Sequence, residues 1–300
     1  MKDRTETAGA KVSDGAPDEL VVESKLRQLI VRSIQSPGYK PPMLPRVAQD
    51  LMRLANDPKT NFNQVEKVLS MDQAMTAKIV KIANSALFSR GTEVRSLKTA
   101  VARLGLVRIR DISFQVVSEA RLFRVKEYQP VLNAEMAHAR SVAILAREVC
   151  SMLFIEKNMA FLCGLLHDVG KAIAFGIVAD WAKKKKRPLP EPELLYYALE
   201  RNHAAIGAGV VETWDLPPII SNSVRLHHEP FQKGSLNQMA AAVAIADMCS
   251  VHAGIGRPAT SLSQDKLKIF YAMNMNPEQV KKIIDYSFKV KEDLETGDDN

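Results

Sequence analysis

The stretch Cys163-Gly-Leu-Leu-His-Asp-Val-Gly-Lys171 sets a histidine and an aspartate side by side within a long apolar segment of this 300-residue chain. The whole segment, Met159–Ala179, is long enough to span a membrane. Its middle, however, holds His167, Asp168 and Lys171, and a charged residue at a bilayer centre costs about 2.5–3.5 kcal/mol on insertion scales. We therefore expect a helix that is buried in a protein core.

Histidines are confined to one part of the chain. All six lie between residues 138 and 252, and five of them form an ordered series that a carboxylate closes at Asp247. His138, His203 and His227 each share a helical stripe with apolar residues spaced at three- or four-residue steps, which predicts that three separate helices direct them into the core. The full series is His138, His167, Asp168, His203, His227, His228 and Asp247.

This series has the composition of a metal site. Asp168 and Asp247 have no basic partner in their own apolar helices except Lys171, and an unpaired buried carboxylate is costly. A lone core histidine is usually a hydrogen-bonded packing residue, but the ordered set predicts one or two divalent ions. Nitrogen and oxygen ligands favour Fe, Mn, Zn or Ni over Ca.

Adjacent His167 and Asp168 could serve two neighbouring ions, with the Asp168 carboxylate bridging them. Such a pair of metals clamps a phosphoryl group during in-line displacement, so phosphate-ester hydrolysis is the reaction that this set would support, with Asp168 and Lys171 as catalytic residues. Lys171 could steady the phosphate, or it could form a salt bridge to Asp168 or lie exposed. For Cys163 and Cys249, core packing is favoured over a role as thiolate ligands.

Composition is that of a globular protein, with 46% hydrophobic and 25% charged residues. Three cysteines without paired spacing argue against a disulfide framework and for a reducing cytoplasm. Met1–Pro17 is polar and lacks the apolar core of a signal peptide. We expect residues 1–20 to form a disordered tail and expect no membrane partner.

Apolar residues recur at three- and four-residue steps through most of the chain, and convincing β-alternation is absent. These patterns predict an all-α protein of two packed helical lobes. Tyr128-Gln-Pro130 interrupts the helical pattern, which places the lobes at about residues 21–128 and 129–260. Further helices and an acidic tail are expected in residues 261–300. Because the first lobe has no histidine, metal chemistry belongs to the second.

Basic residues are dense between Lys78 and Asp111, within a chain whose net charge is +7. They predict a surface for nucleic acid or another polyanion, although only Phe88 supplies an aromatic ring and no recognition motif is present. A second basic run, Lys183–Arg187, is typical of a solvated helix end. The candidate binding residues are Lys78, Lys81, Arg90, Arg95, Lys98, Arg103, Arg108 and Arg110.

The stretch quoted first resembles the HD-domain signature of metal-dependent phosphohydrolases. The rest of the chain is similar to the HDOD subgroup, the HD-related output domains of bacterial signalling proteins, from about Pro42 to Ala253. The matching motifs are Leu44-Pro45, Ser70-Met-Asp-Gln73, Lys81-Ile-Ala-Asn-Ser-Ala86, Ser96-Leu-Lys-Thr-Ala-Val-Ala-Arg-Leu-Gly105, His203-Ala-Ala-Ile-Gly207, Trp214-Asp-Leu-Pro217 and His227-His-Glu-Pro230.

The resemblance implies that the second lobe is an HD-domain-like helical bundle. HD enzymes hold metals with the positions that match His138, His167, Asp168 and Asp247, and binuclear relatives add those that match His203, His227 and His228. HDOD domains, in contrast, have generally been regarded as regulatory or interaction modules. The Gly-Tyr-Pro loop of the cyclic-di-GMP phosphodiesterase relatives is replaced here by Pro230–Asn237, which argues against hydrolysis of that nucleotide.

Three functions follow as hypotheses. The first is a bacterial signal-transduction output module of HDOD type with a divalent-metal site, which acts by binding a nucleotide ligand or a signalling protein partner. The second is an active metal-dependent phosphohydrolase. The third is a nucleic-acid-binding regulator that uses the basic first lobe.

Overall fold

The computed structural model describes residues 17–70, 72–85, 91–200 and 202–297. Within these ranges the protein is all-α, as the periodicity predicts, apart from one small hairpin of β1 (Phe231–Gln232) and β2 (Ser235–Leu236). The two residues between the strands, Lys233 and Gly234, both have positive φ, which a tight two-residue hairpin turn requires. This hairpin lies where the sequence predicts no strand, in the Pro230–Asn237 segment.

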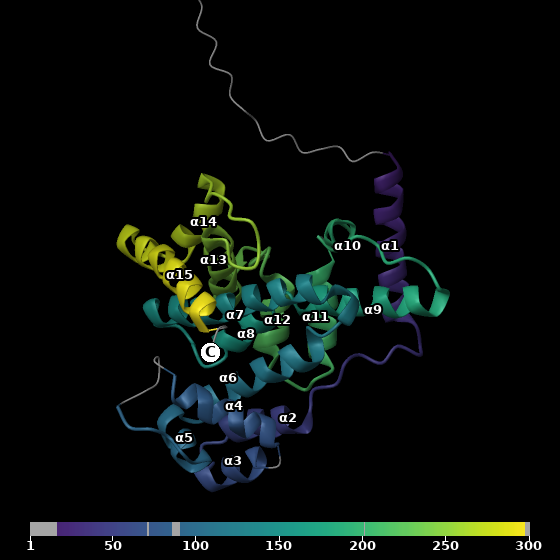
Figure 1. Ribbon diagram of the computed structural model, residues 1–300. Coiled ribbons are helices and arrows are strands. Elements are labelled where there is room, and N and C mark those ends of the chain that lie inside the picture. The colour runs from purple at the N-terminus through teal and green to yellow at the C-terminus, as the bar shows by residue number, and fades with distance from the viewer. Residues whose placement is uncertain (1–16, 71, 86–90, 201, 298–300) are drawn as a thin grey trace, which may run out of the picture.

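The first lobe is built from α2 (Arg46–Asn56), α3 (Phe62–Leu69), α4 (Gln73–Ala83), α5 (Leu97–Leu104) and α6 (Leu106–Val117). It forms the lower part of the molecule in Figure 1. Side chains of Asn61, Asp72 and Ser96 cap the N-termini of α3, α4 and α5. Each accepts a hydrogen bond from a backbone N–H that has no partner within its helix.

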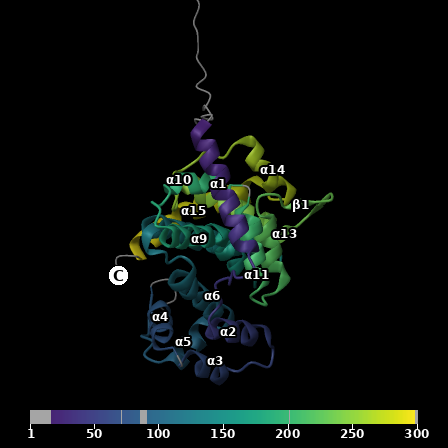
Figure 2. The same ribbon diagram turned by 90° about the vertical axis from the view of Figure 1, so that its right-hand side faces the viewer.

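Helix α1 (Pro17–Gln35) does not belong to this lobe. It lies against α9 (Val169–Lys185) and α10 (Pro192–Leu199) of the second lobe, as Figures 1 and 2 show. Its apolar side chains Leu26 and Ile30 are buried there. Two expected boundaries therefore change: the helix begins inside the predicted tail of residues 1–20, of which residues 1–16 lie outside the described ranges, and the predicted lobe of residues 21–128 loses its first helix.

The second lobe is centred on α7 (Gln129–Met152), which packs against α8 (Ala160–Leu166) and α13 (Gln238–Ala253). Helices α11 (His203–Glu212) and α12 (Pro218–Leu226) pack on each other and close one side. The C-terminal helices α14 (Gln264–Ala272) and α15 (Pro277–Gly297) also join this lobe, since α15 lies on α7 and α13. The second lobe thus extends beyond residue 260.

Two apolar helical stretches are each divided by a break. The segment 158–179 breaks at His167-Asp168, between α8 and α9, and the segment 191–214 breaks between α10 and α11, so that His203 opens α11. Close backbone packing accompanies the first break, because a Cβ at Gly170 would lie 2.0 Å from the carbonyl oxygen of His203. The breaks therefore bring His203 next to His167 and Asp168.

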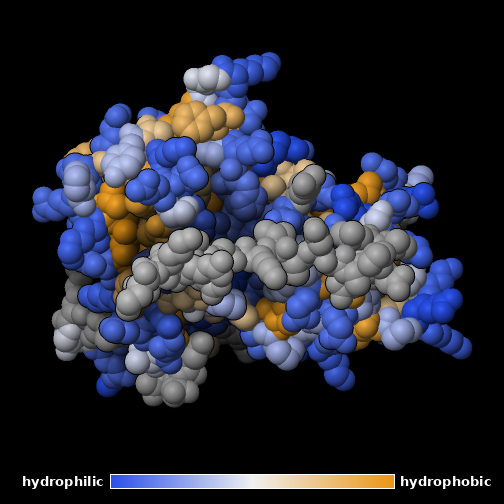
Figure 3. Space-filling model, turned by 90° about the horizontal axis from the view of Figure 1, so that it is seen from above, coloured by the Kyte–Doolittle hydropathy of each residue, from blue (hydrophilic) through white to orange (hydrophobic). Residues whose placement is uncertain are grey.

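One stretch, Ala160–Lys185, is long and apolar enough to cross a membrane, and 89% of its most apolar window is buried inside the structure. It comprises α8 and α9, which turn at His167-Asp168. The face in Figure 3 is largely hydrophilic, with apolar side chains gathered in a few patches. The burial of this stretch agrees with the expectation of a core segment.

A buried arginine of the first lobe links the two lobes. Arg110 of α6 is 0% exposed and its Nη2 lies 2.6 Å from Asp111 Oδ1. The same nitrogen donates to the carbonyl oxygen of Asn158, in the loop that precedes α8. The chain then enters the second lobe through the π-helical turn η1 (Ser118–Leu122) and the 3-10 turn η2 (Lys126–Tyr128).

Candidate metal centre

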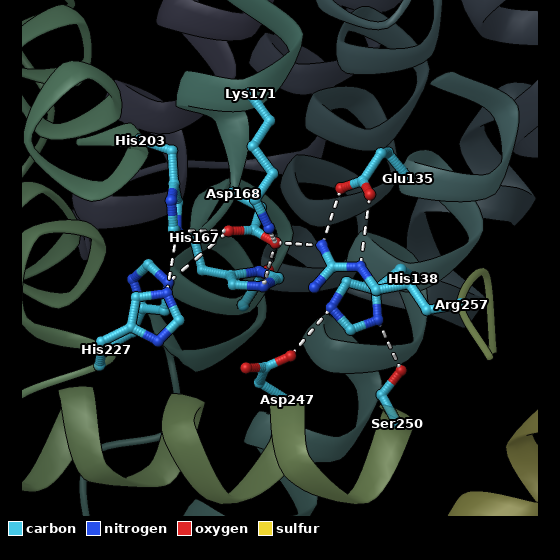
Figure 4. Close-up of polar contacts among 12 residues, drawn as sticks. Glu135, His138, His167, Asp168, Lys171, His203, His227, Asp247, Ser250 and Arg257 are labelled. Carbon is cyan, nitrogen blue, oxygen red and sulfur yellow. Dashed lines mark hydrogen bonds and ion pairs between the residues drawn. The ribbon is translucent and has the colours of Figure 1, made fainter. Parts of the chain in front are cut away.

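The structure brings all the expected metal ligands together around Asp168, at the break between α8 and α9 (Figure 4). Two groups of potential ligands share this carboxylate. One comprises His203, His227 and His228, and the other comprises His138 and His167. Asp247 of α13 lies beside the second group, with its Oδ1 3.0 Å from His138 Nε2.

The distances between these atoms match those between ligands of one ion. Two ligand atoms about 2.1 Å from a metal lie about 3.0 Å apart at octahedral angles and about 3.4 Å apart at tetrahedral angles. Asp168 Oδ1 is 3.1 Å from His203 Nε2 and 3.6 Å from His227 Nε2, and Asp168 Oδ2 is 3.2 Å from His167 Nε2. His228 Nε2 is 2.9 Å from His203 Nε2.

The protein fixes which nitrogen of each ring faces the centre. Nδ1 of His167, His203 and His227 lies 2.7, 2.9 and 2.7 Å from the carbonyl oxygens of Gly164, Leu199 and Val224. Because a carbonyl can only accept, Nδ1 carries the proton, and the lone pair of Nε2 is free in the neutral ring. Metal-ligating histidines are held in this way.

Several of the inward atoms are buried and make no hydrogen bond of acceptable geometry among the described residues: Nε2 of His138, His167 and His227, and Oδ1 of Asp168 and Asp247. Unsatisfied buried polar atoms are rare in proteins and need an explanation such as an ion. At His167 and His227 a nitrogen lone pair faces an oxygen of Asp168, and both atoms are acceptors. A cation between them would satisfy both, so the residues present fit a divalent metal.

Electrostatics keep most of these groups in the form that binds a metal. Burial lowers the pKa of His138 and His227. Partial burial, together with the neighbouring His227 and His203, lowers the pKa of His228 to about 3. Burial opposes, but His167 and Lys171 outweigh it and hold the pKa of Asp168 well below its ordinary value. For His167, the Asp168 carboxylate outweighs burial and raises the pKa.

Arg257 and Glu135 are parts of the centre that the sequence pattern does not reveal. Arg257 follows α13, and its Nη2 lies 2.5 Å from Asp168 Oδ2 and 2.8 Å from Glu135 Oε2. Asp168 therefore has a basic partner outside its own helix, contrary to the expectation that Lys171 is its only one. Helical spacing does not predict this contact, because Arg257 reaches Asp168 from a loop.

The structure shows the surroundings of Lys171 and of the two candidate cysteines. Lys171 is 7% exposed and its Nζ lies 2.6 Å from Asp168 Oδ2, so of the alternatives for this residue the salt bridge is present and exposure is excluded. Cys163 and Cys249 are fully buried, and burial raises the pKa of each thiol to about 12. Both thus have the packing role that the sequence favours.

The basic residues of the first lobe differ in exposure and in their partners. Arg110 is buried in the lobe junction, which removes it from the predicted polyanion site. Lys78 pairs with Glu119 and Arg95 with Glu93, while Arg103 donates to the carbonyl oxygens of Ala83 and Thr92. Lys81 and Lys98 are exposed, Arg108 is half-buried, and Arg90 lies outside the described residues.

The fold and the site define a class: all-α proteins with a buried histidine and carboxylate centre suited to a divalent metal. The HDOD domain model matches residues 42–230, and the chain belongs to that family. The fold is similar to that of a protein from Shewanella amazonensis SB2B, assigned by inference as a metal-dependent phosphohydrolase (TM-score 0.67, 21% identity, 89% of this chain and 99% of that chain). It is also similar to an HDOD domain protein of unknown function from Geobacter sulfurreducens (TM-score 0.61, 22% identity, 91% and 94%).

Curated relatives match shorter parts. An uncharacterized protein of Treponema pallidum (strain Nichols) is 24% identical over 214 residues, which is 69% of this chain and 41% of that protein. Ribonuclease Y of Mycoplasma mycoides is 32% identical over 155 residues, 51% of this chain and 30% of the enzyme. The chain thus spans less than half the length of these relatives.

Proposed function

We propose that the protein is a signal-transduction output module of HDOD type whose second lobe binds a divalent metal ion, and that it acts by binding a ligand or a protein partner. The observation that carries the metal part is the set of buried Nε2 atoms that face carboxylate oxygens without a proton between them. Such a set costs free energy until a cation is bound, so metal binding would stabilise this lobe.

A structural link between the centre and the first lobe supports the signalling part. Helix α8 ends next to His167, and the loop before α8 is held at Asn158 by Arg110 of α6. A change at the metal centre that shifts α8 would therefore act on the lobe junction. Allostery requires two sites that bias one element, and α8 is the element that both regions contact.

Metal analysis of freshly purified protein tests the proposal. We expect bound divalent metal in the wild type and none in the variant with His167→Ala and Asp168→Ala, with a rise in melting temperature on metal addition only for the wild type. Circular dichroism of the double variant checks that it remains helical. Failure of the wild type to bind Fe²⁺, Mn²⁺, Zn²⁺ or Ni²⁺ would exclude this function.

A metal-dependent phosphohydrolase is the second candidate, and the cationic groups at Asp168 favour it. A metal held by the histidines would supply Lewis-acid activation of water and of a phosphoryl oxygen. The Lys171 ammonium and the Arg257 guanidinium would face an anionic substrate beside that ion. Turnover of a panel of nucleotides, phosphodiesters and RNA by metal-loaded protein, abolished in the same double variant, would establish it.

A further inference from the structure

Arg257 is held in the metal centre from two sides (Figure 4). Its Nη2 lies 2.8 Å from Glu135 Oε2 and its Nε lies 3.3 Å from Glu135 Oε1, while Nη2 also reaches Asp168 Oδ2. Glu135 itself is 1% exposed and accepts a hydrogen bond from Tyr196 Oη at 2.9 Å. A forked guanidinium on a fixed carboxylate loses little conformational freedom when it binds, so the arrangement is well determined.

The backbone before Arg257 is equally constrained. Gly256 has φ +68°, and a Cβ there would lie 2.1 Å from the carbonyl oxygen of Ala134 in α7. Only glycine permits this turn to lie directly on the helix that carries Glu135 and His138. The position of Arg257 therefore follows from a close backbone contact and from its ion pair with Glu135.

The two oxygens of Asp168 have different partners. Oδ2 receives Lys171 Nζ at 2.6 Å and Arg257 Nη2 at 2.5 Å, whereas Oδ1 makes no hydrogen bond among the described residues and faces His203 and His227. A carboxylate offers about four lone-pair sites, about two on each oxygen. The sites of Oδ2 are filled, so a metal on that oxygen would have to displace a cationic side chain.

The net charge of the centre also favours one bound ion over two. Glu135, Asp168 and Asp247 are the three carboxylates of the centre, and Lys171 and Arg257 are its two cationic side chains. With neutral imidazoles, the protein contributes one net negative charge. One divalent ion leaves a single positive charge that an anionic ligand can neutralise. Two divalent ions would leave three positive charges in a buried site, which is costly.

We propose that Arg257 takes the place of a second metal ion, so that the centre binds a single divalent ion on the Oδ1 side of Asp168, with His203, His227 and His228. This inference rests on the proposed metal-binding function and adds the number and position of the ions. The second ligand group, His138 and His167 with Asp168, then holds no ion of its own.

Titration with Co²⁺, followed by its absorption bands and by the metal retained after gel filtration, counts the ions. We expect one equivalent in the wild type and two in Arg257→Met, which keeps the length of the side chain and removes the charge. Arg225→Met is the matched control, since Arg225 forms a surface pair with Glu212 away from the centre, and it should bind one equivalent. Two equivalents in the wild type, or one in Arg257→Met, would overturn the inference.

Ligand variants locate the ion. In the wild-type background, His203→Ala should lose the single Co²⁺ equivalent, and Asp247→Asn should retain it. Asp247→Asn keeps the shape of the side chain, so folding should survive, and circular dichroism checks both variants. Loss in Asp247→Asn with retention in His203→Ala would place the ion on the other side and refute the inference, while metal binding itself would stand. No Co²⁺ in any variant would refute both.

Discussion

Two buried aspartates, Asp111 at the lobe junction and Asp168 in the metal centre, each lie against basic side chains but differ in the direction in which their pKa is shifted. Burial outweighs the neighbouring Arg110 and raises the pKa of Asp111 to about 6. At Asp168 burial acts in the same direction, yet His167 and Lys171 outweigh it and the pKa falls well below its ordinary value. The balance between burial and the neighbouring groups that stabilise the ionised form decides the direction of each pKa shift.

The comparison separates a structural ion pair from a binding centre. Around Asp111 the contacts are with arginines, Arg110 at 2.6 Å and Arg147 at 3.6 Å, and an arginine keeps its protons and cannot bind a metal. Around Asp168 several contacts are with imidazole nitrogens that have no proton to donate. Both aspartates are buried, so burial does not distinguish the two sites. The feature that indicates metal binding is the imidazole lone pairs that face Asp168.

The largest expected effect is on the stability of the lobe junction. Arg110→Met removes the principal partner of Asp111 and should lower the free energy of unfolding by about 3 kcal/mol at pH 7, because a buried charge then keeps only the longer contact to Arg147. Urea denaturation measures this change. The number of bound metal ions should remain that of the wild type, and a loss of metal in this variant would contradict the separation of the two sites.

The next effect is on metal binding. Asp168→Asn removes the carboxylate that both ligand groups share and should weaken divalent-metal affinity by about 100-fold or more, since loss of a supporting residue alone costs about 10–100-fold. Isothermal titration with Mn²⁺ measures the affinity. Asp111→Asn makes the same chemical change at the junction and serves as the control. Equal losses in both variants would show that stability, not ligation, governs binding.

The smallest effect is a pH dependence that belongs to Asp111 alone. Its folded-state pKa of about 6 exceeds the ordinary value of 3.8, so the folded protein binds the proton more tightly than the unfolded chain. The resulting stability is present below pH 3.8 and is lost as pH rises through about 6. Relative to Asp111→Asn, which does not titrate, the wild type should lose about 2 kcal/mol between pH 4.5 and 7.

Urea unfolding of both proteins at these two pH values measures the difference, and the titration of every other group cancels between them. A wild type that gains relative stability as pH rises would mean that Arg110 and Arg147 outweigh burial. Asp111 would then resemble Asp168.

Much of the fold and of the candidate ligand set was predictable from local pattern. The helical stripe that contains His138 and Val142 is buried as expected, because three- and four-residue spacing reports which side of a helix meets the core. The stripe from Leu199 to His203 crosses a break in the helix, yet His203 still faces inward with its Nδ1 on the Leu199 carbonyl. The inward direction predicted for the His203 side chain is therefore confirmed, although the helix is divided.

The features that the sequence did not predict all depend on contacts between segments that are far apart in the chain. Arg110 falls in a basic run, but its burial at the junction depends on its contact with Asn158, which lies 48 residues further along the chain. Arg257 reaches Asp168 across 89 residues of sequence. Helix α1 has its own apolar stripe, but that stripe does not specify which lobe will cover it.

The sequence by itself determined that this protein is helical, that its histidines belong to the second lobe, and that His167-Asp168 lies in an apolar core, because periodicity and polarity are local properties. Only the tertiary structure decided that Asp168 has one oxygen engaged by Lys171 and Arg257 and one left open to His203 and His227. That asymmetry depends on the turn at Gly256 packing against α7, a contact that no spacing in the sequence encodes.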